Sequence, residues 1–102
     1  MSLTIFPTLP GAIVRHQVLK GLNVTQGDLA KAMGVSKVRV NHIINGRAPI
    51  TVNMALRLAR VTNTTPEYWL RLQIEWDLHH AKRRMRREIE KLEPLCASSG
   101  DD

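Results

Sequence analysis

The chain has 102 residues, enough for one domain with a modest hydrophobic core but not for two. It carries 15 lysines and arginines against 9 acidic residues, a formal net charge of +6. Eight basic residues and one acid lie between positions 11 and 60, so that segment has a net charge of +7 and the remainder is slightly acidic. This concentration favours a polyanionic partner, although a solvated basic surface is the simpler alternative.

Membrane and secretion signals are not expected in this sequence. No apolar run approaches the roughly 20 residues of a membrane-spanning helix, and the N-terminus lacks a signal-peptide pattern. Cys96 is the only cysteine, so an internal disulfide is impossible and a reducing compartment fits. We therefore expect a cytoplasmic protein without a membrane partner.

The N-terminal residues predict an arm followed by a helix. Residues 1–10 contain two prolines and no periodicity, which indicates an extended lead-in, with Ile5 and Phe6 packing on the domain. Apolar spacing over 11–20 predicts a first helix, and Gly21 is expected to end it.

Residues 25–47 predict two short helices joined by a tight turn. Thr25 is expected to cap the first helix. Gly34 should end that helix, because glycine tolerates the left-handed conformation of a sharp turn. Ser36 is expected to cap the second helix. The residues of the second helix that should turn inward are Val40, Ile43 and Ile44.

The outward face of this second helix carries cationic, amide and imidazole groups, which read base edges and phosphates. We expect Lys37 to meet guanine acceptors, Asn41 adenine, and Val38 a thymine methyl group. Gln26, at the start of the preceding helix, is expected to hold a phosphate. The candidate DNA-binding residues are Gln26, Ser36, Lys37, Val38, Arg39, Asn41, His42, Asn45 and Arg47.

Several of these positions have alternative roles. Arg39, Asn45 and Arg47 are expected to contact the DNA backbone rather than bases. Asn45 is equally suited to be a local helix cap, and His42 a passive surface residue. For the whole segment, a helical hairpin without a nucleic-acid role is the alternative, but the second helix is too polar and basic for a packing element.

Two further helices complete an all-α, five-helix fold. Thr51 should cap a fourth helix, which Asn63 and Thr64 break. The run Thr65-Pro66-Glu67 restarts the chain as a fifth helix, with a cap, a proline at the first position and an acid in the first turn. The core stripe of the fourth helix should contain Met54, Ala55, Leu58, Ala59 and Val61.

The fifth helix carries two apolar stripes, whereas a small domain needs only one to dock a helix. The first, expected to complete the core, contains Tyr68, Trp69, Leu72 and Trp76. The second contains Leu70, Ile74, Leu78, Ala81, Met85, Ile89 and Leu92. We expect the second stripe to meet another chain and form a homodimer, with both stripes buried in one domain as the alternative. The predicted interface residues are Leu70, Ile74, Leu78, Ala81 and Met85.

The C-terminal region predicts an extension of the fifth helix and then a tail. The basic stretch 82–91 is expected to be a solvated or frayed helix end, with an extra phosphate contact as the alternative. Whether the helix stops near His80 or runs to Leu92 stays open. Residues 95–102 are small and acidic, and are expected to be disordered. The predicted division is an arm (1–10), a helix-turn-helix domain (11–80), and a basic extension with a disordered tail (81–102).

Residues 25–47 resemble the helix-turn-helix of the lambda-repressor-like (Cro/cI, XRE) family. The matching residues are Gln26, Leu29, Ala30, Met33, Gly34, Val35, Val40 and Ile43. Residues 50–78, above all the run from Pro66 to Gln73, resemble the second half of HigA-type (VapI-like) addiction-module antitoxins. The resemblance covers roughly residues 5–80, and the chain departs from the family in its basic stretch after His79.

The resemblance implies a small protein that dimerises, binds operator DNA to repress its own operon, and neutralises a RelE-like ribonuclease toxin. For the toxin, an acidic contact surface would be expected. The available acids are Glu67, Glu75, Asp77, Glu88, Glu90 and Glu93, for which ordinary solvated charges are the alternative. The first alternative function is a stand-alone XRE-type transcriptional repressor without a toxin partner. The second alternative is a protein-interaction module that has lost DNA binding.

Catalysis, cofactors and metals are not expected. The sequence contains no phosphate-binding loop, and no grouping of serine or cysteine with histidine suggests a nucleophile. His79 and His80 are adjacent, so on a helix they point about 100° apart and cannot share a metal as an i, i+4 pair would.

Overall fold

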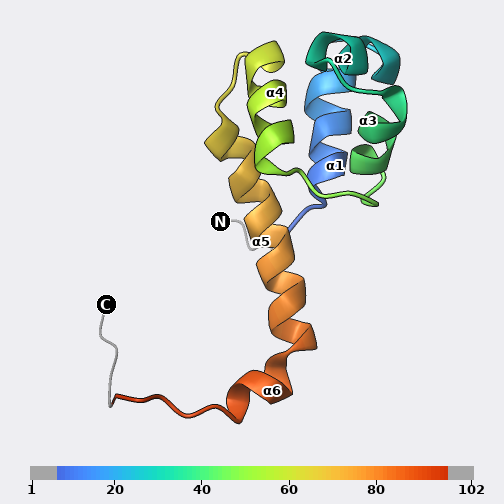
Figure 1. Ribbon diagram of the computed structural model, residues 1–102. Coiled ribbons are helices and arrows are strands. Elements are labelled where there is room, and N and C mark those ends of the chain that lie inside the picture. The colour runs from blue at the N-terminus through green and yellow to red at the C-terminus, as the bar shows by residue number, and fades with distance from the viewer. Residues whose placement is uncertain (1–6, 97–102) are drawn as a thin grey trace, which may run out of the picture.

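The computed structural model describes residues 7–96, and these form helices and connecting turns without a strand (Figure 1). The predicted all-α fold is therefore confirmed. Ile5 and Phe6, and most of the predicted disordered tail, lie outside the described residues. The helices are α1 (Pro10–Ile13), the π-helical segment η1 (Val14–Lys20), α2 (Gln26–Met33), α3 (Lys37–Ile44), α4 (Val52–Thr62), α5 (Pro66–Arg84) and α6 (Arg86–Glu90).

The first helix begins at Pro10, where a missing backbone N–H removes no helical hydrogen bond. α1 and η1 follow each other without a break and together fill the single helix predicted over 11–20. Gly11 lies directly against the end of α3: a Cβ atom there would clash with the carbonyl oxygens of Ile43 and Ile44. Only glycine therefore allows these two helices to cross so closely.

The predicted helix caps are present. The hydroxyl oxygens of Thr25, Ser36, Thr51 and Thr65 each accept a hydrogen bond from the backbone N–H three residues later. At the other end of α2, Gly34 has φ 73°, and Asn63 has φ 57° after α4. Local sequence signals thus determine where these helices begin and end.

Substituting Gly34 with alanine should lower the free energy of unfolding by roughly 1–2 kcal/mol, because a side chain is strained in the left-handed region. Gly27 provides a matched control, since a Cβ atom there meets only the Thr25 hydroxyl, at 3.7 Å. Gly27→Ala should stabilise the chain by about 0.4–1 kcal/mol. Urea unfolding of both variants measures the difference, and equal effects would contradict the assigned turn.

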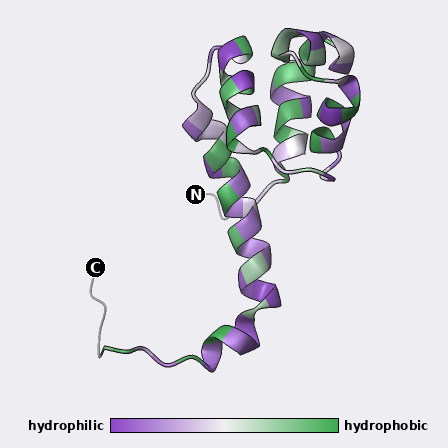
Figure 2. Ribbon diagram, viewed as in Figure 1, coloured by the Kyte–Doolittle hydropathy of each residue, from purple (hydrophilic) through white to green (hydrophobic). Residues whose placement is uncertain are grey.

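The hydrophobic core lies between α1, η1, α2, α3, α4 and the first turns of α5. Trp69 is the largest fully buried side chain of this core. Tyr68, Leu70 and Leu72 are partly buried and pack against the core. Figure 2 shows apolar residues gathered on the inward sides of these helices. The buried core residues are Val14, Val18, Leu29, Ala30, Met33, Val40, Ile43, Ile44, Ile50, Met54, Ala55, Leu58, Ala59 and Trp69.

The second half of α5 projects away from this core (Figure 1). The helix ends at Arg84, and Met85, with φ −100° and ψ 8°, separates it from the short α6. The extension is therefore not one continuous helix to Leu92. The run of cations from Lys82 to Arg87 explains the break, because like charges three and four residues apart repel on a helix. Within the described residues, no helix is both long and apolar enough to cross a membrane.

Candidate nucleic-acid interface

The helix α3 presents its polar face to solvent. Its apolar residues Val40, Ile43 and Ile44 are buried, as predicted. Because they fix the inward face, the first turn exposes Lys37, Arg39 and Val38, the last of which is 62% exposed despite being apolar. An exposed valine between two cations suits contact with a thymine methyl group between phosphates.

The preceding helix α2 is fixed by a capping box. The Asp28 backbone N–H donates to the Thr25 hydroxyl oxygen at 3.0 Å, and the Thr25 N–H donates to the Asp28 carboxylate at 3.0 Å. Two interactions with Thr25 lower the pKa of Asp28: first the hydrogen bond from the Thr25 backbone N–H, and then an interaction with the Thr25 hydroxyl. Burial opposes them by raising the pKa, and the Lys31 charge makes the smallest contribution, which again lowers it.

The lowered pKa of Asp28 predicts a pH-dependent contribution to stability. A carboxyl group whose pKa is lower in the folded state stabilises that state above its unfolded pKa of about 3.9, and the stabilisation is lost as the pH falls through the folded pKa. Asp28→Asn should therefore unfold more easily than the unmodified chain at neutral pH, and the difference should vanish in acid. Urea unfolding at both pH values measures this, and a constant difference would contradict it.

A hydrogen bond joins the two helices of the motif at their outward surface. The Asn41 amide NH₂ donates to the Gln26 side-chain oxygen at 3.2 Å, and both side chains are half-buried. An amide NH₂ has two hydrogens, so Asn41 keeps one donor and its oxygen for the edge of an adenine. The Gln26 NH₂ group is left to face a phosphate. The structure thus brings two of the predicted residues together and orients the one expected to read a base.

At the C-terminal end of α3, Asn45 serves as a local cap. Its NH₂ group donates to the Asn41 carbonyl oxygen at 3.0 Å, and its own oxygen accepts from the Arg15 guanidinium at 3.3 Å. The sequence did not identify Arg15, because 30 positions separate it from Asn45. Its place beside α3 adds a cation to the candidate surface.

The loop after α3 folds back on His42. The carbonyl oxygen of His42, whose side chain is half-buried, accepts hydrogen bonds from the N–H groups of Arg47 at 2.8 Å and Ala48 at 3.2 Å. Gly46, with φ 76°, makes this turn possible. Arg47 is exposed as a result, which fits the predicted contact with a DNA backbone.

Arg57, an exposed residue of α4, caps the C-terminal end of α2. Its guanidinium donates to the Met33 carbonyl oxygen at 2.8 Å and to the Asn53 side-chain oxygen at 2.8 Å. Because the last carbonyls of a helix lack partners within it, this arginine stabilises the turn between α2 and α3.

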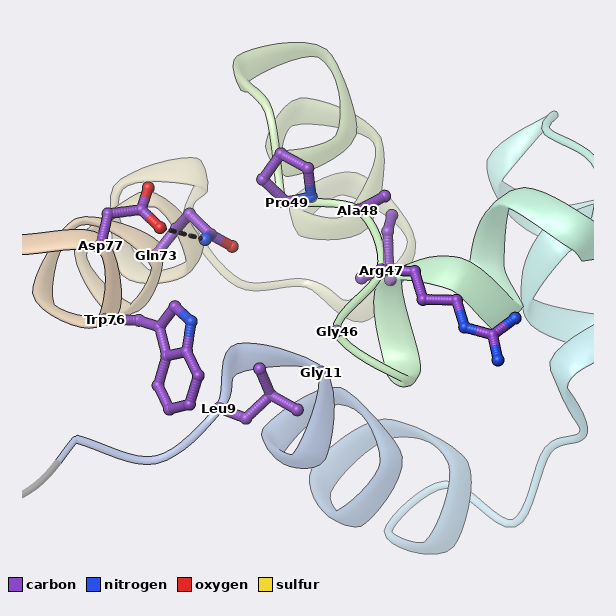
Figure 3. A pocket seen from close by; sticks show the side chains of 10 residues that line it. Leu9, Gly11, Gly46, Arg47, Ala48, Pro49, Gln73, Trp76 and Asp77 are labelled. Carbon is purple, nitrogen blue, oxygen red and sulfur yellow. Dashed lines mark hydrogen bonds between the residues drawn. The ribbon is translucent and has the colours of Figure 1, made fainter. Parts of the chain in front are cut away.

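A groove of about 360 Å³ lies between α5 and the loop after α3 (Figure 3). Trp76 lines it with Leu9 and is only half-buried, so it does not complete the core as predicted. Gln73 fixes α5 at this point, accepting from the Ile50 N–H at 2.8 Å and donating to Asp77 at 3.0 Å. The guanidinium of Arg47 points away from the groove in Figure 3.

In the part of the chain that the structure describes, three or more histidine, cysteine or acidic side chains nowhere gather closely enough to hold a metal ion. Burial, followed by the neighbouring charges of His80 and Arg83, lowers the pKa of His79. His80 packs against Trp76, with ring centroids 4.3 Å apart.

The core, the glycine turn and the outward α3 define a helix-turn-helix domain. The helix-turn-helix family profile matches residues 16–69. The chain belongs to this family and, within it, to the HigA-type antitoxins of the XRE class.

Three similar proteins support this placement. The chain is 40% identical over 84 residues to an uncharacterised HTH-type transcriptional regulator of Haemophilus influenzae, covering 79% of this chain and 78% of the relative. It is 34% identical over 92 residues to antitoxin HigA-1 of Vibrio cholerae, covering 90% and 87%. The structure of Pseudomonas aeruginosa antitoxin HigA with the higBA promoter superposes with a TM-score of 0.82 at 35% identity, covering 88% of this chain and 99% of that one.

Proposed function

We propose that this chain is a sequence-specific repressor that binds the operator of its own operon, and that it is the antitoxin of a toxin–antitoxin pair. The observation that carries the DNA-binding part is the exposed face of α3, where Asn41 is oriented by Gln26 and flanked by Lys37 and Arg39. A relative of the same fold, P. aeruginosa HigA, has been solved with promoter DNA.

In this proposal α3 enters the major groove. Lys37, Val38 and Asn41 read base edges, and Ser36 and His42 lie beside them at the groove. The backbone-contacting residues are Gln26, Arg39, Arg47 and Arg15. Asn45 supports α3 from its end through Asn41 rather than contacting DNA itself.

Footprinting on the DNA upstream of the gene tests this function. A dimeric repressor should protect two half-sites whose centres lie about one helical turn, 34–36 Å, or a multiple of it apart. Absence of a protected site upstream, with equal affinity for unrelated duplexes, would reject the repressor.

The homodimer is proposed from the second apolar stripe of α5. Ile74 is 60% exposed and Leu78 is 50% exposed, and Met85 is also exposed, whereas Leu70, at the start of the stripe, packs partly against the core. Exposed apolar residues in a row along one projecting helix indicate an interaction surface. The proposed interface therefore runs from Ile74 through Leu78 and Ala81 to Met85.

Leu78→Asp should convert the dimer to a monomer, because a charge would be buried in the centre of the apolar interface. Leu56→Asp is the matched control, since Leu56 is similarly exposed, at 55%, but lies on α4. Sedimentation velocity on both variants measures the oligomeric state. A dimer that survives Leu78→Asp, or dissociates equally with Leu56→Asp, would exclude this interface.

The toxin partner is proposed to be a RelE-like ribonuclease. Support comes from the similarity to antitoxin HigA-1 over most of both chains. The alternative, a stand-alone XRE-type repressor, is favoured by the relative described only as a transcriptional regulator. Co-expression with the product of the adjacent gene distinguishes the two functions. A stable complex that restores growth supports the antitoxin, whereas failure to form a complex supports the stand-alone repressor.

A further inference from the structure

The exposed half of α5 carries charges arranged around its apolar stripe. At about 100° per residue, Ile74, Leu78, Ala81 and Met85 lie within a narrow arc. Asp77 and Arg84 then lie about 70–90° to one side of that arc, and Glu75 and Lys82 lie as far to the other. Each flank thus has an acid near the domain and a base near the free end of α5.

From this arrangement we infer that two copies pair through α5 in an antiparallel orientation, with Ile74 facing the partner copy's Met85 and Leu78 facing its Ala81. The inference deepens the proposed homodimer by naming its direction and register. In an antiparallel pair of helices related by a twofold axis, each flank meets the same flank of the other copy. Asp77 then meets Arg84 of the second copy, and Glu75 meets its Lys82.

The observed surroundings of these side chains fit such pairing. All four are exposed in the projecting part of α5. One carboxylate oxygen of Asp77 accepts a hydrogen bond from the Gln73 NH₂ group, so the other oxygen can accept from the Arg84 guanidinium of the second copy. Gln73 is itself anchored by the Ile50 N–H. The carboxylate is therefore held in place before the second copy arrives, which reduces the entropy lost on pairing.

In a parallel pair only Asp77 and Lys82 of these four residues would meet as opposite charges, and the neighbouring cations would oppose association. The two clusters of cations between Lys82 and Arg87 would then lie side by side, and like charges across an interface disfavour association. The antiparallel pair instead separates these clusters and places each beside the acids of the other copy. Charges flanking an apolar seam commonly select the orientation of paired helices.

A charge-swap experiment tests this orientation, with the dimer dissociation constant measured by sedimentation equilibrium of the full chain without DNA. Asp77→Arg and Arg84→Asp should each weaken the dimer about ten-fold, because two symmetric like-charge contacts form per dimer. The double variant D77R/R84D should recover an affinity within about three-fold of the unmodified chain. Circular dichroism confirms that each variant folds.

The double variant D77R/K82D is the control for direction. In a parallel pair Asp77 would lie beside Lys82 of the second copy, so rescue by K82D and not by R84D would overturn the inference. Absence of rescue by R84D would also overturn it. If Leu78→Asp breaks the dimer but the charge swaps do not change its affinity, the proposed homodimer stands and only the antiparallel register is overturned. If the unmodified chain is itself monomeric, both the homodimer and the register are overturned.

Discussion

Trp69→Ala should lower the free energy of unfolding by about 3–5 kcal/mol, a large part of the 5–15 kcal/mol typical of a whole domain. The side chain is 1% exposed and is the largest fully buried one in the core. Its indole N–H donates to the Thr64 hydroxyl oxygen at 2.8 Å, so truncation removes a part-buried hydrogen bond as well as apolar contacts. Urea unfolding followed by circular dichroism measures the loss.

Trp76→Ala is the matched control for this substitution. The same indole is removed from the same helix, but Trp76 is only half-buried at an open groove. We therefore expect a clearly smaller loss of stability. Equal losses would show that the centre of the core has been placed on the wrong tryptophan.

Lys37→Ala and Asn41→Ala should each weaken specific operator binding by about 1–3 kcal/mol, or about 5- to 150-fold in dissociation constant. Lys37 is exposed in the first turn of α3, and Asn41 is oriented by Gln26 at 3.2 Å. The two substitutions should also relax the preference for particular bases, because both side chains are proposed to read base edges.

Gln26→Ala gives a more specific test of how Asn41 is held. If Gln26 orients Asn41, its removal should reduce discrimination at the same base pair that Asn41→Ala affects. Lys91→Ala, which removes an exposed lysine beyond α6, is the control for charge alone. Fluorescence anisotropy with single-base operator variants measures these effects. Unchanged operator affinity in both Lys37→Ala and Asn41→Ala would reject the assigned reading surface.

Local features of the fold could be predicted because their causes lie within a few residues. The cap at Ser36 and the turn at Gly34 depend on short-range hydrogen bonds and on one backbone conformation. The inward side of α3 follows from the spacing of its apolar residues. These features together were sufficient to predict the helix-turn-helix.

Contacts between distant segments could not be predicted in this way. Arg57 has the spacing of a surface helix residue, and only packing of α4 against α2 brings it to the Met33 carbonyl. The bond between Arg15 and Asn45 likewise depends on how α1 and η1 lie beside α3. Helical periodicity assigned Trp76 to the core, but at this position α5 borders an open groove and the side chain stays half-buried.

Recognition of a particular operator by α3 is the property on which the proposed function rests. The most direct test is an anisotropy titration of the full chain against the DNA upstream of its own gene, with a scrambled duplex as competitor, over a range of salt concentrations. We predict tight binding that prefers the upstream duplex, with an affinity that falls steeply as salt rises because phosphate contacts release counterions. Weak and equal binding to both duplexes would contradict the claim and leave only a basic surface.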